Sequence, residues 1–264
     1  PSPEGREEGK PSTPFLSTST SPPFPEIENG ETLNFAASEL AFLAEKTLFA
    51  TSTDSTRLNL NGVYLEAKDG KISMVATDGH RLGRASIDQE GANLENGVII
   101  PKKVLQHILH VAKSDSNIEV RTSATHILFN TDSTQVISKL YEGPYPNYRA
   151  VIPQNFERTM QANTQDLQNK IRSVISMANV RTRQIRLQMD GNNLELSATD
   201  PDVGGDSREA LAVTHNGEGS FCIGFNGQYL SEILGLSKSE EIVMKMNSPI
   251  GAGVIEPGGG DSGF

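Results

Sequence analysis

The sequence repeats itself with a period of about 121 to 125 residues. Residues 104–114 return as residues 229–239, with five identities at one constant offset of 125. The run that ends in Ala76-Thr77-Asp78 returns at an offset of 122, and Phe15-Leu16-Ser17 has a counterpart at an offset of 121. A unit of this length can bury its own hydrophobic core. The chain is therefore predicted to consist of similar domains in tandem.

Each repeat combines amphipathic helices with hairpins. Apolar residues spaced three and four apart predict helices over 37–51, 102–112, 166–178 and 227–236. Asp69-Gly70 and Asp190-Gly191 supply the positive φ angles that tight hairpin turns require. The strands are predicted at 58–67, 71–77, 81–87, 98–100, 117–121, 126–130, 135–140, 185–189, 193–198, 209–214, 221–223, 241–246 and 253–256. This pattern predicts an α+β fold with antiparallel sheets and the helices on one face.

The composition narrows the class of protein. The single cysteine, Cys222, rules out an internal disulfide and fits a reducing compartment. No apolar run approaches the roughly 20 residues that a membrane helix needs, and residues 1–10 do not resemble a signal peptide. We therefore expect a cytoplasmic protein without a membrane partner. A net charge of −10 argues against a simple cationic nucleic-acid binder but leaves room for local basic faces.

No motif predicts an active site. The segment from Gly5 to Lys10 is one residue too short for a phosphate-binding loop and is followed by proline. His107 and His110 lack further metal ligands nearby in the sequence. A hydrolase that uses Asp78 and His80 would need a nucleophile, and none is evident. The sequence therefore predicts neither an enzyme nor a cofactor or metal.

Basic residues gather in two predicted helical regions. Residues 102–113 contain Lys102, Lys103 and Lys113 and no acidic residue, and residues 170–186 contain five cations, again without an acid. In an acidic protein this confinement suggests a selected positive face, although an ordinary solvated face explains it equally well.

Three motifs, in the right order, resemble the bacterial replicative sliding clamps, the beta subunits of DNA polymerase III. Ala76-Thr77-Asp78-Gly79-His80-Arg81-Leu82 resembles the family's signature. Ser138-Lys139-Leu140, followed by Gly143-Pro144-Tyr145-Pro146-Asn147-Tyr148, resembles its domain-end motif. Ile223-Gly224-Phe225-Asn226 with Tyr229-Leu230 resembles its last domain, so the resemblance extends from about Phe15 to Pro257.

The resemblance implies three similar domains per subunit and a head-to-tail homodimer that encircles duplex DNA. Sheets would form the outside of this ring and two helices of each domain the inner face. We accordingly interpret residues 1–31 as a disordered start and the tail end of a truncated first clamp domain. Residues 32–152 would be the central clamp domain, and residues 153–264 the C-terminal clamp domain without its last strand. Contacts with DNA would be sequence-neutral, and the residues expected to face it are Lys102, Lys103, Lys170 and Arg172.

The resemblance also implies a hydrophobic pocket that binds short peptides with Leu and Phe anchors. The residues that match pocket positions are Leu60, Thr77, Gly79, His80, Arg81, Leu82, Pro146 and Val151. The expected partners are the catalytic subunit of DNA polymerase III, the clamp loader and other proteins with clamp-binding motifs. The chain would be a non-catalytic processivity factor, with polymerase or exonuclease activity belonging to its partners. The alternative is a clamp-derived interaction module that binds partner peptides without encircling DNA.

Overall fold

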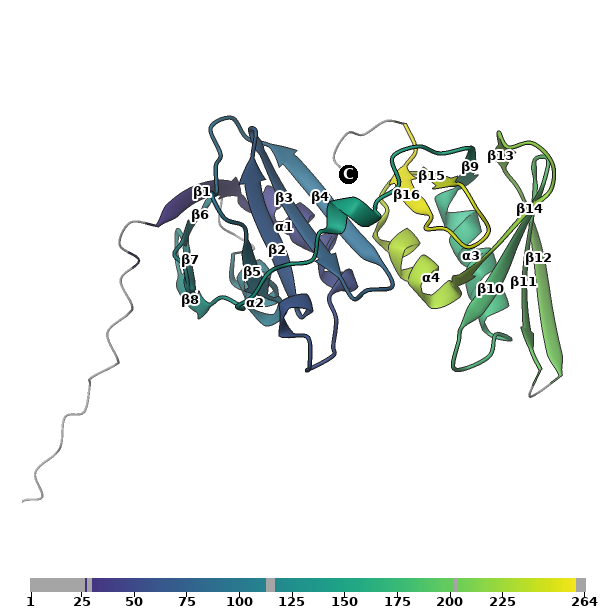
Figure 1. Ribbon diagram of the computed structural model, residues 1–264, viewed down its shortest axis with the longest axis horizontal. Helices are drawn as coiled ribbons and strands as arrows, with labels where there is room; N and C mark the ends of the chain where they lie inside the picture. Colours follow the sequence, from purple (N-terminus) through teal and green to yellow (C-terminus); the bar gives the residue numbers. More distant parts are fainter. Residues whose placement is uncertain (1–26, 28–29, 113–116, 202–203, 260–264) are drawn as a thin grey trace, which may run out of the picture.

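The computed structural model describes residue 27 and residues 30–112, 117–201 and 204–259. Two units follow one another along this part of the chain (Figure 1). Each unit has its own hydrophobic core, one built from residues between Leu33 and Phe129 and the other from residues between Met160 and Met246. The segments 1–26 and 260–264, including the N-terminal end of the sequence repeat, lie outside the described residues.

The first unit contains eight strands and two α-helices among the described residues. They are β1 (Glu31–Ala36), α1 (Ala37–Glu45), β2 (Gly62–Lys68), β3 (Lys71–Thr77), β4 (Leu82–Asp88), β5 (Val98–Pro101), α2 (Lys102–Val111), β6 (Asn117–Thr122), β7 (His126–Thr131) and β8 (Gln135–Lys139). Short 3-10 helices, η1 (Leu48–Ala50) and η2 (Leu58–Leu60), connect α1 to β2. The strands form two antiparallel sheets with the orders β1-β6-β7-β8 and β4-β3-β2-β5.

The second unit repeats this design. After η3 (Tyr148–Val151) come β9 (Arg158–Asn163), α3 (Thr164–Ile175), β10 (Gln184–Asp190), β11 (Asn193–Asp200), β12 (Gly205–Ala212), β13 (Thr214–His215), β14 (Phe221–Asn226), α4 (Gly227–Leu236), β15 (Glu241–Met246) and β16 (Val254–Pro257). The sheets have the orders β12-β11-β10-β14 and β13-β9-β15-β16 and are also antiparallel. The predicted α+β class is therefore confirmed.

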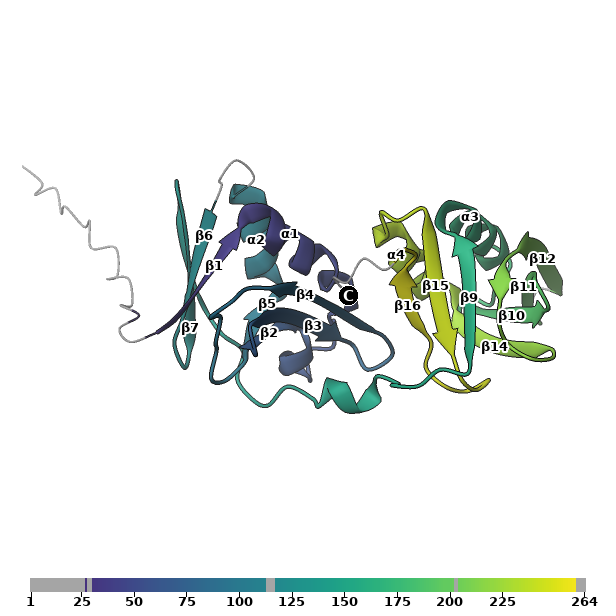
Figure 2. The same cartoon turned by 90° about the horizontal axis from the view of Figure 1, so that it is seen from above.

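The two helices of the second unit, α3 and α4, begin at asparagine caps. The side chain of Asn163 accepts a hydrogen bond from Asp166 N at 3.0 Å, and that of Asn226 accepts one from Gln228 N at 3.0 Å. These bonds satisfy amide groups that a helix start leaves without partners. Leu167, Ile171 and Val174 of α3 then point into the core. In the second view the helices of both units lie along the same side of the molecule (Figure 2).

The predictions of secondary structure fail at short elements, where only a few residues carry the pattern. Residues 58–60 form η2 instead of the start of a strand, because Leu60 N donates to Arg57 O and closes a tight turn. β1 and β9 were not predicted, since each buries only two residues, and a single alternating pair is too short a pattern to indicate a strand. The predicted helix over 37–51 ends at Glu45 and is followed by η1.

Candidate functional site

The tight turn between β3 and β4 lies at the end of the first unit that faces the second unit. Thr77 at the end of β3 organises it: its hydroxyl accepts a hydrogen bond from Gly79 N at 3.0 Å and donates one to Arg81 O at 2.7 Å. Gly79 has a φ of 92°, a left-handed conformation that costs glycine little. The turn therefore holds Thr77, Gly79, His80, Arg81 and Leu82 together in a fixed arrangement.

Asp78 stabilises the turn through hydrogen bonds from its carboxylate to neighbouring residues. One carboxylate oxygen accepts hydrogen bonds from His80 N at 2.9 Å and Arg81 N at 3.0 Å, and the other accepts one from Arg81 Nε at 3.1 Å. This is the local hydrogen bonding for which aspartate is favoured in turns. Asp78 contacts only the backbone of His80 through these bonds, and the imidazole of His80 is exposed. The carboxylate thus has a structural role that accounts for its position.

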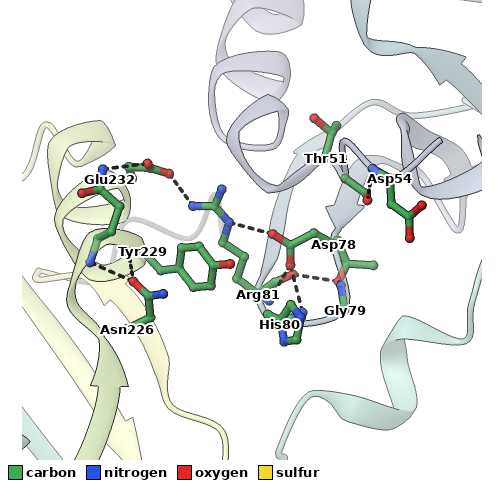
Figure 3. Close-up of polar contacts among 12 residues, drawn as sticks. Thr51, Asp54, Asp78, Gly79, His80, Arg81, Asn226, Tyr229 and Glu232 are labelled. Carbon is green, nitrogen blue, oxygen red and sulfur yellow. Dashed lines mark hydrogen bonds and ion pairs between the residues drawn. The ribbon is translucent and has the colours of Figure 1, made fainter. Parts of the chain in front are cut away.

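Arg81 crosses from the first unit to the second (Figure 3). Its Nη1 donates to Glu232 of α4, and its guanidinium lies over the ring of Tyr229 at 4.3 Å from the ring centroid. The ring of Phe49, from the first unit, lies 5.4 Å from the same guanidinium. The Arg81 side chain is only 14 % exposed. The guanidinium of Arg81 therefore contacts one carboxylate and one aromatic ring from each unit. Asp78 and Phe49 belong to the first unit, and Glu232 and Tyr229 belong to the second.

Two further side chains join the units next to Arg81. Nζ of Lys46, the residue that follows α1, donates to Leu236 O at the last residue of α4. Nζ of Lys238 lies 3.6 Å from the Glu45 carboxylate at the end of α1. Burial lowers the pKa of Lys46, with a further decrease from the nearby charge of Lys238. The C-terminal ends of two helices thus face cations of the opposite unit, which is the favourable arrangement for helix dipoles.

The remaining residues of the expected pocket have different environments. Leu60 is 5 % exposed in η2, whereas Val151 on η3 is 65 % exposed. Arg57, at the start of η2, reaches Asp78 O at 3.4 Å, and Asn59 donates to Pro144 O at 3.0 Å. The structure therefore brings η2 and the segment before Pro146 to the same end of the unit as the turn.

Two tyrosines fix the segment that leaves the first unit. The ring of Tyr145 stacks on that of Tyr64 with centroids 4.8 Å apart, and burial raises the pKa of Tyr145 to about 12. Tyr148 Oη donates to the Glu66 carboxylate at 2.5 Å, and Arg149 Nη2 donates to the same oxygen at 2.5 Å. The connection between the units is thereby anchored to β2.

A groove of about 560 Å³ lies at the junction on the side of α3 and α4. Helices α3 and α4 contribute most of its lining, including Arg172 and Glu232, and Phe49 lines it from the first unit. Arg172 is exposed. One of the cations predicted to face DNA thus stands beside the residue that pairs with Arg81.

The other cations that were predicted to face DNA differ in their exposure and in whether they pair with an acidic residue. Lys103 is exposed and Lys102 half-buried in the first turn of α2, which contains no acidic residue. Lys170 Nζ lies 2.6 Å from Glu209 Oε2, and Ser173 donates to the other oxygen of that carboxylate at 2.8 Å. Hydrogen bonds from Lys170 and Ser173 lower the pKa of Glu209. Much of the charge of Lys170 is therefore already neutralised within the second unit.

The part of the chain that the structure describes contains neither a metal-binding cluster nor a membrane-spanning helix. Across residues 27, 30–112, 117–201 and 204–259, no three His, Cys, Asp or Glu side chains gather in a way that could hold a metal ion. In the same part of the chain no helix has the length and hydropathy to cross a bilayer.

Cys222 is half-buried, and Arg186 Nε donates to its Sγ at 2.7 Å.

The two units match two successive domains of one known family. Residues 34–147 match the family described as DNA polymerase III beta subunit, central domain, and residues 149–262 match its C-terminal domain. The beta sliding clamp of Pseudomonas aeruginosa is 33 % identical over 232 residues, which cover 86 % of this chain and 63 % of the relative. The beta sliding clamp of Pseudomonas putida is 30 % identical, with 93 % of this chain and 68 % of the relative covered. The chain thus spans 62 % to 63 % of the length of the first curated relatives.

Solved structures agree with the sequence matches. The DNA polymerase sliding clamp from Pseudomonas aeruginosa with ligand superposes with a TM-score of 0.85 at 28 % identity, covering 91 % of this chain and 67 % of that one. The beta subunit from the DNA polymerase of Streptococcus pyogenes gives a TM-score of 0.86 at 26 % identity, covering 92 % and 66 %. The fold is therefore that of the sliding clamps. Together with the sequence matches, it shows that the chain belongs to the DNA polymerase III beta subunit family.

Three residues that contact Arg81 at the junction were absent from the sequence-based site. Tyr229 appeared only as part of a family motif, and Phe49 and Glu232 gave no signal. Glu232 lies 151 positions from Arg81 on a helix whose pattern is otherwise ordinary. No spacing rule connects residues that far apart, so only the structure identifies them as neighbours.

Proposed function

We propose that the whole protein is a DNA sliding clamp, a non-catalytic processivity factor that encircles duplex DNA and tethers replication and repair proteins. The strongest support is membership of the DNA polymerase III beta subunit family. The whole protein would form a head-to-tail homodimer in the cytoplasm. Its partners would be the polymerase III catalytic subunit, the clamp loader and other proteins with clamp-binding motifs.

Contact with DNA would come from the side of the molecule that carries the helices. Lys102, Lys103 and Arg172 would interact with phosphates without reading the base sequence. Lys102 and Lys103 occupy the first turn of α2, where the helix dipole disfavours cations. A lysine pair in that position is consistent with a role in binding an anion rather than in stabilising the helix. Because the protein is acidic overall, these contacts would be weak enough to permit sliding.

The partner-peptide pocket would lie around the β3–β4 turn. Leu82, Pro146 and Val151 would offer apolar surface to Leu and Phe anchors, and Gly79 would let the peptide approach the backbone. Exposed apolar side chains support this proposal, since Val151 is 65 % and Leu58 54 % exposed at this end of the unit. A structural neighbour, the clamp from Pseudomonas aeruginosa, was solved with griselimycin bound.

Loading on circular DNA tests the encircling role. The whole protein, loaded by a clamp loader onto nicked circular DNA, is expected to remain bound after gel filtration and to be released when the DNA is linearised. Equal loss from circular and linear DNA would contradict a clamp and would favour an interaction module that binds peptides only.

Peptide binding tests the pocket. Replacing Leu82 with aspartate is expected to abolish binding of a synthetic peptide with Leu and Phe anchors in a calorimetric titration, because a charge would replace apolar wall area. Val180→Asp makes the same kind of change at a side chain that is 70 % exposed in the second unit and should leave binding intact. Unchanged circular dichroism would establish that both variants fold. If Leu82→Asp bound as tightly as the unmodified chain, the pocket would lie elsewhere.

A further inference from the structure

Arg81 has two roles that belong to different parts of the molecule. It is one of the residues of the proposed pocket, and it is also the cation that joins the two units. Its Nε contacts Asp78 of its own turn at 3.1 Å, while its Nη1 contacts Glu232 of α4. The N–H groups of a guanidinium form a rigid fork, so two carboxylate partners together fix its orientation.

The surroundings of Arg81 make this orientation depend on both units. Arg81 and Asp78 are 14 % and 15 % exposed, so their pairing is only weakly screened by solvent. Tyr229 covers the guanidinium from the second unit and Phe49 from the first. The guanidinium is therefore held between surfaces that meet only when the units are in this relative position.

Glu232 is the member of the cluster that the pocket itself does not require. It lies on α4, its carboxylate is 39 % exposed, and Gln228 donates to its other oxygen at 3.0 Å. Burial acts to raise the pKa of Glu232, but the hydrogen bonds from Arg81 and Gln228 outweigh it and lower the pKa. The carboxylate is thus ionised, oriented from its own helix and directed at Arg81.

We propose that Glu232 is a positioning residue that ties the β3–β4 turn to α4, so that the peptide pocket and the relative placement of the two units are coupled. The inference rests on the proposed function, because it concerns the same pocket. A peptide that contacts Arg81 would favour the arrangement in which Arg81 is fixed. A substitution that lowers the population of this arrangement would therefore lower the affinity for the peptide in proportion to the loss of the binding-competent fraction.

The test uses the full chain with two measurements. Peptide affinity is measured by calorimetry with a synthetic peptide carrying Leu and Phe anchors. The distance between the units is measured by electron paramagnetic resonance with spin labels at Glu90→Cys and Glu218→Cys, two exposed loop positions, in a Cys222→Ser background. The variant is Glu232→Gln, which keeps the shape of the side chain and removes its charge. The matched control is Glu240→Gln, at an exposed position of the same unit.

Glu232→Gln is expected to lower the affinity for the peptide about fivefold or more and to broaden the distribution of distances between the spin labels. Glu240→Gln is expected to change neither quantity. Added peptide should narrow the distribution of the unmodified chain. The proposal is overturned if Glu232→Gln weakens the peptide without changing the distances, since Glu232 would then be a local pocket residue. Unchanged distances and affinity would overturn it as well.

Failure of the proposed function gives a different result. If the unmodified chain does not bind the peptide, the pocket assignment is lost, and with it the coupling. A broadened distance distribution in Glu232→Gln would then still establish the carboxylate as the residue that joins the units. The distance measurement therefore separates the two conclusions.

Discussion

At the scale of single residues, one carboxylate fixes the connection between the units. Glu66 of β2 accepts hydrogen bonds from Tyr148 Oη and from Arg149 Nη2, each at 2.5 Å. Tyr148 is 4 % exposed, so its ring and hydroxyl group are both removed from solvent. A hydrogen bond to a charged group contributes about 1.5–3 kcal/mol, more than one between neutral partners.

Replacing Tyr148 with phenylalanine is expected to lower the free energy of unfolding by about 1–2 kcal/mol, because Glu66 keeps Arg149 as a partner but loses the hydroxyl group. Urea unfolding followed by circular dichroism measures this change. Tyr141→Phe removes a hydroxyl group from a half-buried ring and serves as the control, with an expected change below about 0.5 kcal/mol. Equal effects of the two substitutions would show that the bond to Glu66 is not stabilising.

The same hydrogen bond makes stability depend on alkaline pH. Burial first, and then the hydrogen bond and negative charge of Glu66, raise the pKa of Tyr148 above its ordinary value of about 10. The folded state therefore holds the phenolic proton more tightly than the unfolded state. This stabilisation is complete below about pH 10 and is lost as the pH rises further toward the pKa of the folded state. In Tyr148→Phe the free energy of unfolding should accordingly decrease less steeply above pH 10 than in the unmodified chain.

At the scale of helices and strands, the sequence predicts best where the apolar spacing extends over several turns. Helix α4 was predicted at 227–236 from its apolar spacing and occupies that range, and the structure shows that Asn226 caps it and that Leu230 and Leu234 are buried. The prediction failed at η2, where three residues close a turn. The sequence also could not show that Lys170 of α3 is paired, because Glu209 is 39 positions away on β12. Long-range pairs of this kind depend on the packing of α3 against β12, which local patterns do not encode.

The pairing of Lys170 leads to a prediction about α3. Binding of the chain to a linear duplex at low ionic strength, followed by fluorescence anisotropy across a salt series, should weaken in Arg172→Ala, with a salt slope smaller by about one. Lys170→Ala should change the slope less, because Glu209 already neutralises that lysine. Glu209→Gln should strengthen binding by releasing Lys170. Lys71→Ala, at an exposed hairpin position, is the control without an expected effect.

Equal losses in Lys170→Ala and Arg172→Ala would show that the bridge to Glu209 opens when DNA binds. No change in either variant, with Lys103→Ala also unchanged, would contradict a DNA-facing role for this side of the molecule. The ranking of the variants is therefore more informative than the affinity of any one of them.

At the scale of the whole molecule, the family and the turn could be predicted from sequence, but the junction could not. The motif from Thr77 to Leu82 is contiguous, and its residues occupy one turn as expected. The contacts of Arg81 with Tyr229 and Glu232 and of Lys46 with Leu236 O join residues separated by about 150 to 190 positions. They arise from how two folded units meet, which neither unit's own pattern determines. The sequence does not single out these charged residues, since Lys46 directly follows α1 and Glu232 lies within α4, and both segments have an ordinary composition.

The contact between Lys46 and Leu236 O gives a prediction about how the units support each other. Lys46 is 7 % exposed, and its amine reaches the carbonyl group at the end of α4. Lys46→Met keeps most of the apolar stem but leaves this carbonyl without its donor, at a cost of about 1–3 kcal/mol. For a unit of roughly 100 residues each kcal/mol corresponds to about 4–8 °C in melting temperature. Scanning calorimetry should therefore show a lower melting temperature for the second unit.

Lys238→Met is the matched control for this contact. Lys238 is 86 % exposed and lies 3.6 Å from Glu45, so the pair is worth at most about 1 kcal/mol. Its removal should shift the melting temperature little. If both variants melted alike and at the temperature of the unmodified chain, the helix ends would meet without supporting one another. Arg81 and its partners would then hold the junction without help from the helix ends.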